Sequence, residues 1–69
     1  MLQDGTAEYQ WATDVAFDGV RLEILSVEGH MLFDVSLPDV GPMTINTFGK
    51  EIAADTVMAA IDLAHSARQ

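Results

Sequence analysis

The sequence contains no cysteine, so neither a disulfide nor a thiolate-bound metal can stabilise its fold. Basic residues are scarce: three Lys and Arg stand against eleven Asp and Glu, which gives a formal net charge of −8 at pH 7. Because nucleic-acid binding depends on Lys and Arg that neutralise phosphates, this balance excludes ordinary DNA or RNA binding. We therefore expect no direct contact with nucleic acid.

Long apolar runs are also missing. No uncharged stretch approaches the ~20 residues that a membrane span needs. The first residues carry neither the basic nor the apolar region of a signal peptide. We therefore expect a cytoplasmic protein that makes no contact with a membrane.

The sequence lacks the common catalytic and cofactor-binding motifs. It contains no P-loop, GxGxxG, GxSxG or HExxH pattern. Of its two histidines, His65 follows Asp62 at helical spacing and is typical of a surface pair. No nucleophile–base pair or ligand cluster is visible, so we expect no enzyme activity, no catalytic residue, no bound metal and no cofactor.

Apolar residues are plentiful enough for one hydrophobic core. The chain has 69 residues, of which 49% are hydrophobic, and this composition is too apolar for a disordered acidic tail. A chain of this size buries only about 60% of its surface on folding. The sequence therefore predicts a single small acidic domain over residues 1–69.

Apolar and polar residues alternate in three segments, at residues 9–17, 20–24 and 30–37, as they do in half-buried strands. Asp18-Gly19 and Glu28-Gly29 separate the segments and are typical of two-residue hairpin turns. Such turns fix the register, and they pair Val15 with Leu22 and Leu22 with Val35. Both hairpins then place their apolar residues on one face, which predicts a three-stranded antiparallel meander.

The C-terminal part, Ala53–Ala67, has its apolar residues at helical spacing and predicts one helix. Residues 38–50 form the connection, with a short edge strand at Met43–Ile45 as an option. The expected fold is α+β, in the order β-β-β-α, with the helix packed on one sheet face. We expect a shared core of Trp11, Phe17, Leu22, Ile24, Phe33, Val35, Val57 and Ile61.

The opposite face of the sheet is left without a cover by this arrangement. The predicted register gives it one acidic row of Asp14, Glu23 and Asp34. Like charges across a strand pair are destabilising. Three interpretations remain open for this row: a solvated face, a docking point for a basic partner, and a cation site.

A second row on the same face is apolar. It contains Ala12, Leu25 and Leu32, and Val27 follows on the next row. A contiguous apolar patch often marks an interface, although the N-terminal segment or the 38–50 connection could also cover it. The candidate partner-binding residues are Ala12, Asp14, Glu23, Leu25, Val27, Leu32 and Asp34.

These features favour a small acidic protein–protein interaction module that acts stoichiometrically on a basic partner. A partner that normally binds nucleic acid fits the charge, which predicts a phage-type inhibitor or nucleic-acid mimic. Small phage-encoded inhibitors are similar in size and charge. The alternative is a structural or assembly subunit that forms a homodimer or larger homo-oligomer through the uncovered sheet face.

Overall fold

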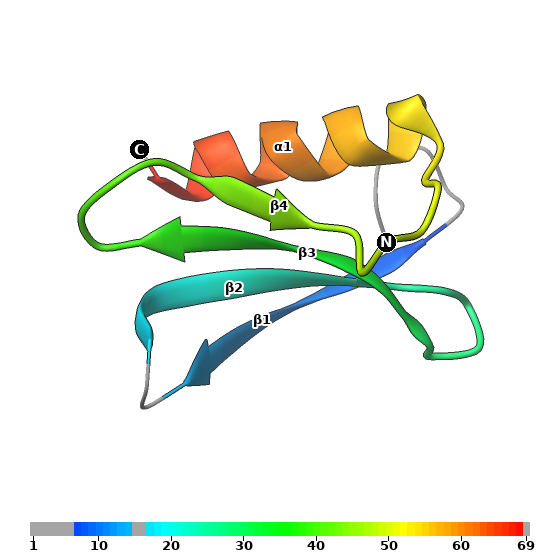
Figure 1. Cartoon of the computed structure of the whole chain (residues 1–69), viewed down its shortest axis with the longest axis horizontal. Helices are drawn as coiled ribbons and strands as arrows, with labels where there is room; N and C mark the ends of the chain where they lie inside the picture. The colour runs from blue at the N-terminus through cyan, green and yellow to red at the C-terminus, as the bar shows by residue number, and fades with distance from the viewer. Residues whose placement is uncertain (1–6, 15–16, 69) are drawn as a thin grey trace.

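The computed structural model describes residues 7–14 and 17–68. An antiparallel sheet is followed by one helix (Figure 1). The elements are β1 (Glu8–Asp14), β2 (Phe17–Leu25), β3 (Met31–Pro38), β4 (Thr44–Asn46) and α1 (Ala54–Arg68). The α+β class with a C-terminal helix is confirmed, but the sheet has four strands in the order β1-β2-β3-β4, not three. The added strand, β4, lies in the predicted connection, within one residue of the edge strand considered as an option at Met43–Ile45.

The register of the second hairpin is as predicted. Leu22 pairs with Val35, and Ile24 pairs with Phe33. The turn is one residue longer than expected, because the Ser26 N–H donates to the His30 carbonyl at 2.8 Å and the Gly29 N–H to the Ser26 carbonyl at 2.8 Å. Gly29 has a φ of +89°, which suits the glycine of a three-residue hairpin loop.

The predicted register of the first hairpin is wrong. Leu22 pairs with Trp11 rather than with Val15, and Asp14 pairs with Phe17. The predicted turn at Asp18-Gly19 is therefore wrong, and Val15, which it was expected to pair with Leu22, lies outside the described residues. Val15 and Trp11 are an even number of residues apart, so the shift keeps the odd-numbered residues of β1 on the face of Leu22.

Asp18-Gly19 lies inside β2 and is not a turn. Gly19 pairs with Pro38 of β3, and the Asp39 N–H donates to the Asp18 carbonyl at 2.8 Å. The φ of Gly19 is +148°, and a Cβ atom there would overlap the Leu37 carbonyl oxygen and lie 2.7 Å from the Pro38 Cα. A glycine is needed here because the two strands approach each other closely. Glycine is common at such close approaches as well as in turns.

The hydrophobic core lies between α1 and the two central strands. Large side chains from β2 and β3 meet small ones from the helix; the buried residues are Leu22, Ile24, Phe33, Val35, Leu37, Ala60 and Ala64, together with Ala7. Thr56 is also buried, one turn before Ala60. This stripe of small residues lets the helix approach the sheet closely, and Val57 and Leu63 pack along its sides.

Leu22, Ile24, Phe33 and Val35 of the expected core are buried and Val57 packs against them, whereas Ile61 lines a groove at the helix margin and Trp11 is not buried. Trp11 is 41% exposed and Tyr9 is 37% exposed, although both lie on the helix side of the sheet. Four strands span roughly 14 Å between the outer strand axes, whereas a helix is about 10 Å wide. The helix packs on β2 and β3, so it leaves the β1 aromatics at its margin. The side chain of Phe17 lies outside the described part of the structure.

We predict that Gly19→Ala destabilises the protein more than Gly29→Ala. Both glycines have a positive φ, which costs an alanine about 1–2 kcal/mol. A Cβ at Gly29 has no neighbour within 4 Å, whereas at Gly19 it meets backbone atoms of β3. Overpacking of this kind adds about 1–3 kcal/mol. Urea unfolding of the two variants measures the difference, and equal losses would contradict the position of Gly19 inside β2.

Candidate protein-interaction surface

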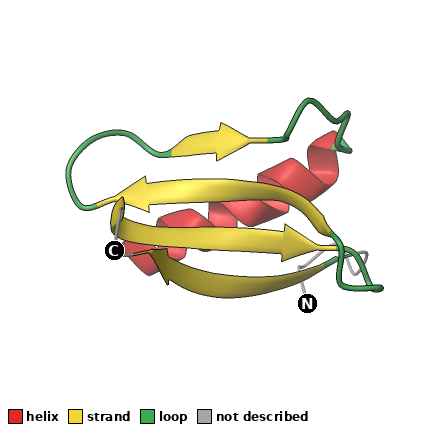
Figure 2. Ribbon diagram, turned by 60° about the horizontal axis from the view of Figure 1, so that its bottom comes forward, coloured by secondary structure: helices red, strands yellow, loops and turns green. Residues whose placement is uncertain are grey.

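The face of the sheet opposite α1 has no other described element packed on it (Figure 2). The pairing of the strands fixes which residues lie there. The polar residues on this face are Gln10 of β1, Arg21 and Glu23 of β2, Asp34 and Ser36 of β3, and Thr44 and Asn46 of β4. The uncovered face is thus polar and spans all strands of the sheet.

Two of the three carboxylates predicted for the acidic row lie side by side. Glu23 and Asp34 are direct partners on the two central strands. Asp14 does not join them, because the shifted register places it opposite Phe17 at the end of β1. Gln10 takes its place, and its Nε2 donates to Glu23 Oε1 at 2.5 Å. The predicted row of three acidic residues is therefore an acidic pair that is extended by an amide.

The charged form of Asp34 is disfavoured, first by the partial burial of its side chain and only then by Glu23. Partial burial raises the pKa of the Asp34 carboxyl, the Arg21 guanidinium lowers it, and Glu23 raises it, so that the net direction is upward. Arg21 lies one pair further along β2 and its Nε donates to Ser36 Oγ at 3.4 Å. The positive charge of Arg21 thus offsets only part of the free-energy cost of ionising Asp34.

The predicted apolar row is not a contiguous patch. Leu25 pairs with Met31, and Leu32 is half-buried and packs against the core. Ala12 lies opposite Arg21, away from Leu25. Val27 is 71% exposed, but it lies in the turn between β2 and β3 rather than on the sheet. The longer turn and the shifted first hairpin explain the dispersal of this row.

The connection before the helix reaches the same end of the sheet. Lys50 Nζ donates to the Met31 carbonyl at 2.8 Å, which ties the segment after β4 to the start of β3. Residues 44–46 of this connection form β4 beside β3, so this part extends the sheet instead of covering its face. The binding of a partner by the seven candidate residues stays a prediction.

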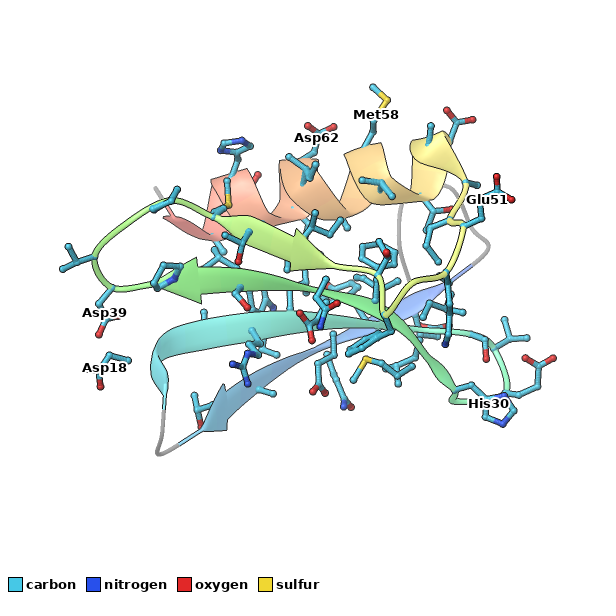
Figure 3. The ribbon with its side chains drawn as sticks, in the orientation of Figure 1. Asp18, His30, Asp39, Glu51, Met58 and Asp62 are labelled. Carbon is cyan, nitrogen blue, oxygen red and sulfur yellow. The ribbon has the colours of Figure 1, made fainter. Side chains whose placement is uncertain are left out.

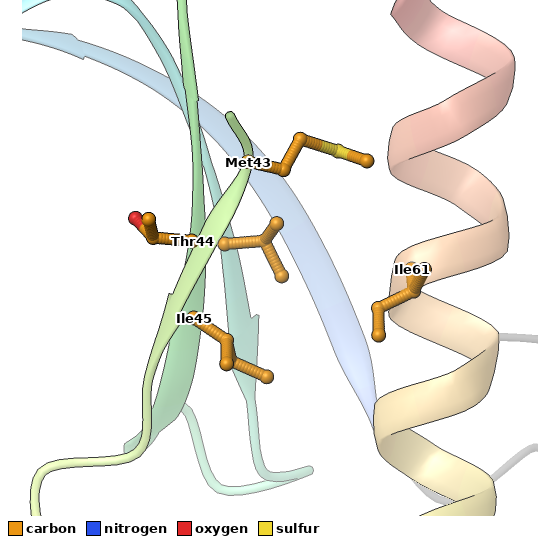
Figure 4. A pocket seen from close by; sticks show the side chains of 5 residues that line it. Met43, Thr44, Ile45 and Ile61 are labelled. Atoms are coloured by element: carbon orange, nitrogen blue, oxygen red, sulfur yellow. The ribbon is translucent and has the colours of Figure 1, made fainter. Parts of the chain in front are cut away.

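Sequence reasoning missed the apolar side chains at the two margins of the helix. One margin carries Tyr9 and Trp11 on β1. The other margin is a groove of about 180 Å³ between β4 and α1 (Figure 4), lined by Val35, Met43, Thr44, Ile45 and Ile61. The groove is smaller than most ligand pockets, which measure about 300–1,000 Å³, and its size suits a single side chain. A comparison of helix width with sheet width is the signal that could have identified both margins.

Other kinds of site find no support in the part of the chain that the structure describes. Residues 7–14 and 17–68 contain no group of three His, Asp or Glu side chains placed to hold a metal ion. Within the same ranges, α1 is too short and too polar to cross a bilayer. Comparisons with protein-family models, curated proteins and solved structures found no match. The surface features of the sheet are therefore the basis for a proposed function.

We predict that Asp34→Asn stabilises the protein at neutral pH by up to about 1 kcal/mol, the size of a cross-strand charge effect. The folded-state pKa of Asp34 is raised. Its charged form is therefore disfavoured by folding, and the penalty is present at neutral pH and disappears as the pH falls through the folded-state pKa. The stability difference between variant and wild type should shrink over that range.

Asp62→Asn is the matched control. Asp62 is exposed and points away from the sheet on the outer side of α1 (Figure 3). The Asp62→Asn substitution removes one negative charge, as Asp34→Asn does, but leaves the acidic pair unchanged. Urea unfolding from neutral to mildly acidic pH measures all three proteins. A pH dependence of Asp34→Asn identical to that of wild type would contradict the role given to Asp34.

Proposed function

We propose that this protein is a small acidic protein–protein interaction module that acts stoichiometrically on a basic partner. The observation that carries the proposal is the Glu23–Asp34 pair at the centre of the uncovered face. Two carboxylates directly across a strand pair lower stability, and a single Asp→Asn change removes the effect. A basic side chain of a partner placed between them converts the repulsion into attraction.

The charge of the whole chain supports this proposal. A net charge of −8 on 69 residues produces a negative field that accelerates the approach of a basic protein. Arg21 lies beside the acidic pair and is the one basic residue of β2 and β3, against three acidic residues on these two strands. In this proposal, charge therefore both steers the partner towards the face and selects it.

The mechanism needs no chemical step. The uncovered face occupies the basic surface of its partner, and the partner loses whatever that surface normally binds. A basic surface that normally binds nucleic acid is the natural target, since phosphates and carboxylates are both recognised by Lys and Arg. The module would then act as an inhibitor by charge mimicry, at one copy per partner.

The test is a charge reversal on the face with a matched reversal elsewhere. Glu23→Lys places a cation between Gln10 and Asp34, whereas Asp62→Lys makes the same change of net charge on the outer side of the helix. We expect Glu23→Lys to stabilise the free domain and to weaken the complex about tenfold or more, as loss of a close charge pair does. Asp62→Lys should keep most of the affinity.

The measurement has two steps. A basic protein captured by the wild type from the native host is purified, and its affinity for each variant is then measured by calorimetry. Equal affinities for Glu23→Lys and Asp62→Lys would contradict docking through the acidic pair. A fixed oligomer of the isolated wild type at micromolar concentration would favour the assembly-subunit alternative instead.

A further inference from the structure

Strand β1 ends the sheet on one side and presents an edge. The strand order is β1-β2-β3-β4, and no strand within residues 7–14 and 17–68 lies beyond β1. Its seven residues, Glu8–Asp14, include no proline, glycine or lysine. Natural proteins protect sheet edges with lysine and other charged residues, proline, bulges or very short strands, and β1 has only its two terminal acidic residues and a register shift between Ala12 and Asp14. The opposite edge, β4, has only three residues and follows Pro42, so β1 is the less protected edge.

The direction of the β1 backbone groups follows from hydrogen bonds at the far side of β2. The Asp18 carbonyl and the Ser26 N–H both bond towards β3 and its flanking residues. Backbone groups alternate in direction along an antiparallel strand, so the odd-numbered residues of β2 bond towards β1. Their partners on β1 include Gln10 and Ala12.

The remaining residues of β1 consequently aim their backbone groups outward. These residues are Tyr9, Trp11 and Thr13, which alternate with Gln10 and Ala12. Tyr9 and Trp11 also hold their half-exposed rings on the helix side, next to this edge. Outward backbone groups and partly exposed aromatic rings therefore occur at the same residues.

A strand added to this edge would satisfy both features. Its backbone would bond to the outward N–H and C=O groups, as in recognition by strand addition. Alternate side chains would cover the rings of Tyr9 and Trp11 on the helix side, where apolar residues pack and cations lie over aromatic faces. The other side chains would lie beside Gln10, next to Glu23 on the uncovered face.

Charge decides between the candidate occupants. The charged residues of β1, Glu8 and Asp14, are both acidic, and the chain as a whole carries −8. A second copy would bring two acidic strands together, and like charges at a strand pair are destabilising. An extended basic segment meets the opposite sign at Glu8 and Asp14, at the two ends of β1, and lies about 10 Å, or two strand spacings, from the strand of Glu23.

We propose that β1 is a strand-addition site for an extended segment of a basic partner, in which basic and apolar residues alternate. This inference rests on the proposed function and adds the mode of docking. The uncovered face supplies the charge, and the β1 edge supplies backbone bonds and an apolar contact. A partner bound in this way would extend the sheet beyond β1.

The test uses two synthetic peptides and one backbone variant. In the first peptide lysine and valine alternate; the second has the same composition in two blocks. Thr13→Pro removes one outward N–H and is compatible with an edge strand, whereas Thr13→Val keeps that N–H. Trp11 is the sole tryptophan of the chain, so its fluorescence reports binding at β1 directly. Circular dichroism verifies that each variant is folded.

We expect the alternating peptide to bind about tenfold tighter than the block peptide and to shift the Trp11 emission to the blue. Loss of one backbone hydrogen bond in Thr13→Pro should weaken it about fivefold, with no loss in Thr13→Val. Equal binding of the two peptides, or equal binding to the two Thr13 variants, would overturn strand addition. A wild-type dimer that forms through β1 in sedimentation would overturn the choice of a basic occupant.

The two proposals fail in different ways. If the peptides bind equally but Glu23→Lys abolishes their binding, strand addition is wrong and docking by charge stands. If Glu23→Lys leaves the affinity of the purified partner unchanged while the peptides still discriminate at Thr13, the edge is a docking site and the acidic pair is not.

Discussion

The width of a single helix constrains the whole structure. An α-helix about 10 Å across cannot cover a sheet whose outer strand axes lie roughly 14 Å apart. Helix α1 packs on β2 and β3 through Ala60 and Ala64, whose small side chains bring it close to Leu22 and Phe33. The two central strands and the helix therefore form the core. Among the described residues, no other element packs on the second face of the sheet.

The candidate interaction surfaces follow from this incomplete cover. On the helix side, the margins expose Tyr9 and Trp11 at β1 and Ile45 beside the groove at β4. On the other side of the sheet, no described element covers the half-buried Glu23–Asp34 pair. In the proposed mode of binding, charge on one face steers and selects the partner, and apolar groups at one edge supply affinity.

Much of the fold was predictable because the spacing of apolar residues identifies the strands, the helix and the buried face even where the predicted register is wrong. The helix and the pairing of Leu22 with Val35 follow directly from the spacing of apolar residues. The first hairpin does not, because an Asp-Gly sequence serves equally as a turn and as a close approach, and only the nearness of Pro38 to Gly19 separates the two. That error placed Asp14 in the acidic row, whereas the structure pairs Asp14 with Phe17 and Glu23 with Gln10. The exposure of Trp11 was not predicted either, because a side chain on the helix side of the sheet is not necessarily buried when it belongs to an edge strand.

Backbone amide hydrogen exchange along β1 tests the central claim most directly. The account predicts alternation in the free protein: the amides of Gln10 and Ala12, which face β2, exchange slowly, and those of Trp11 and Thr13 exchange rapidly at an uncovered edge. Amides of the central strands, such as Phe33, should be the slowest. Uniform protection along β1, or protection of Trp11 and Thr13 in the monomer, would contradict an exposed edge and the docking derived from it.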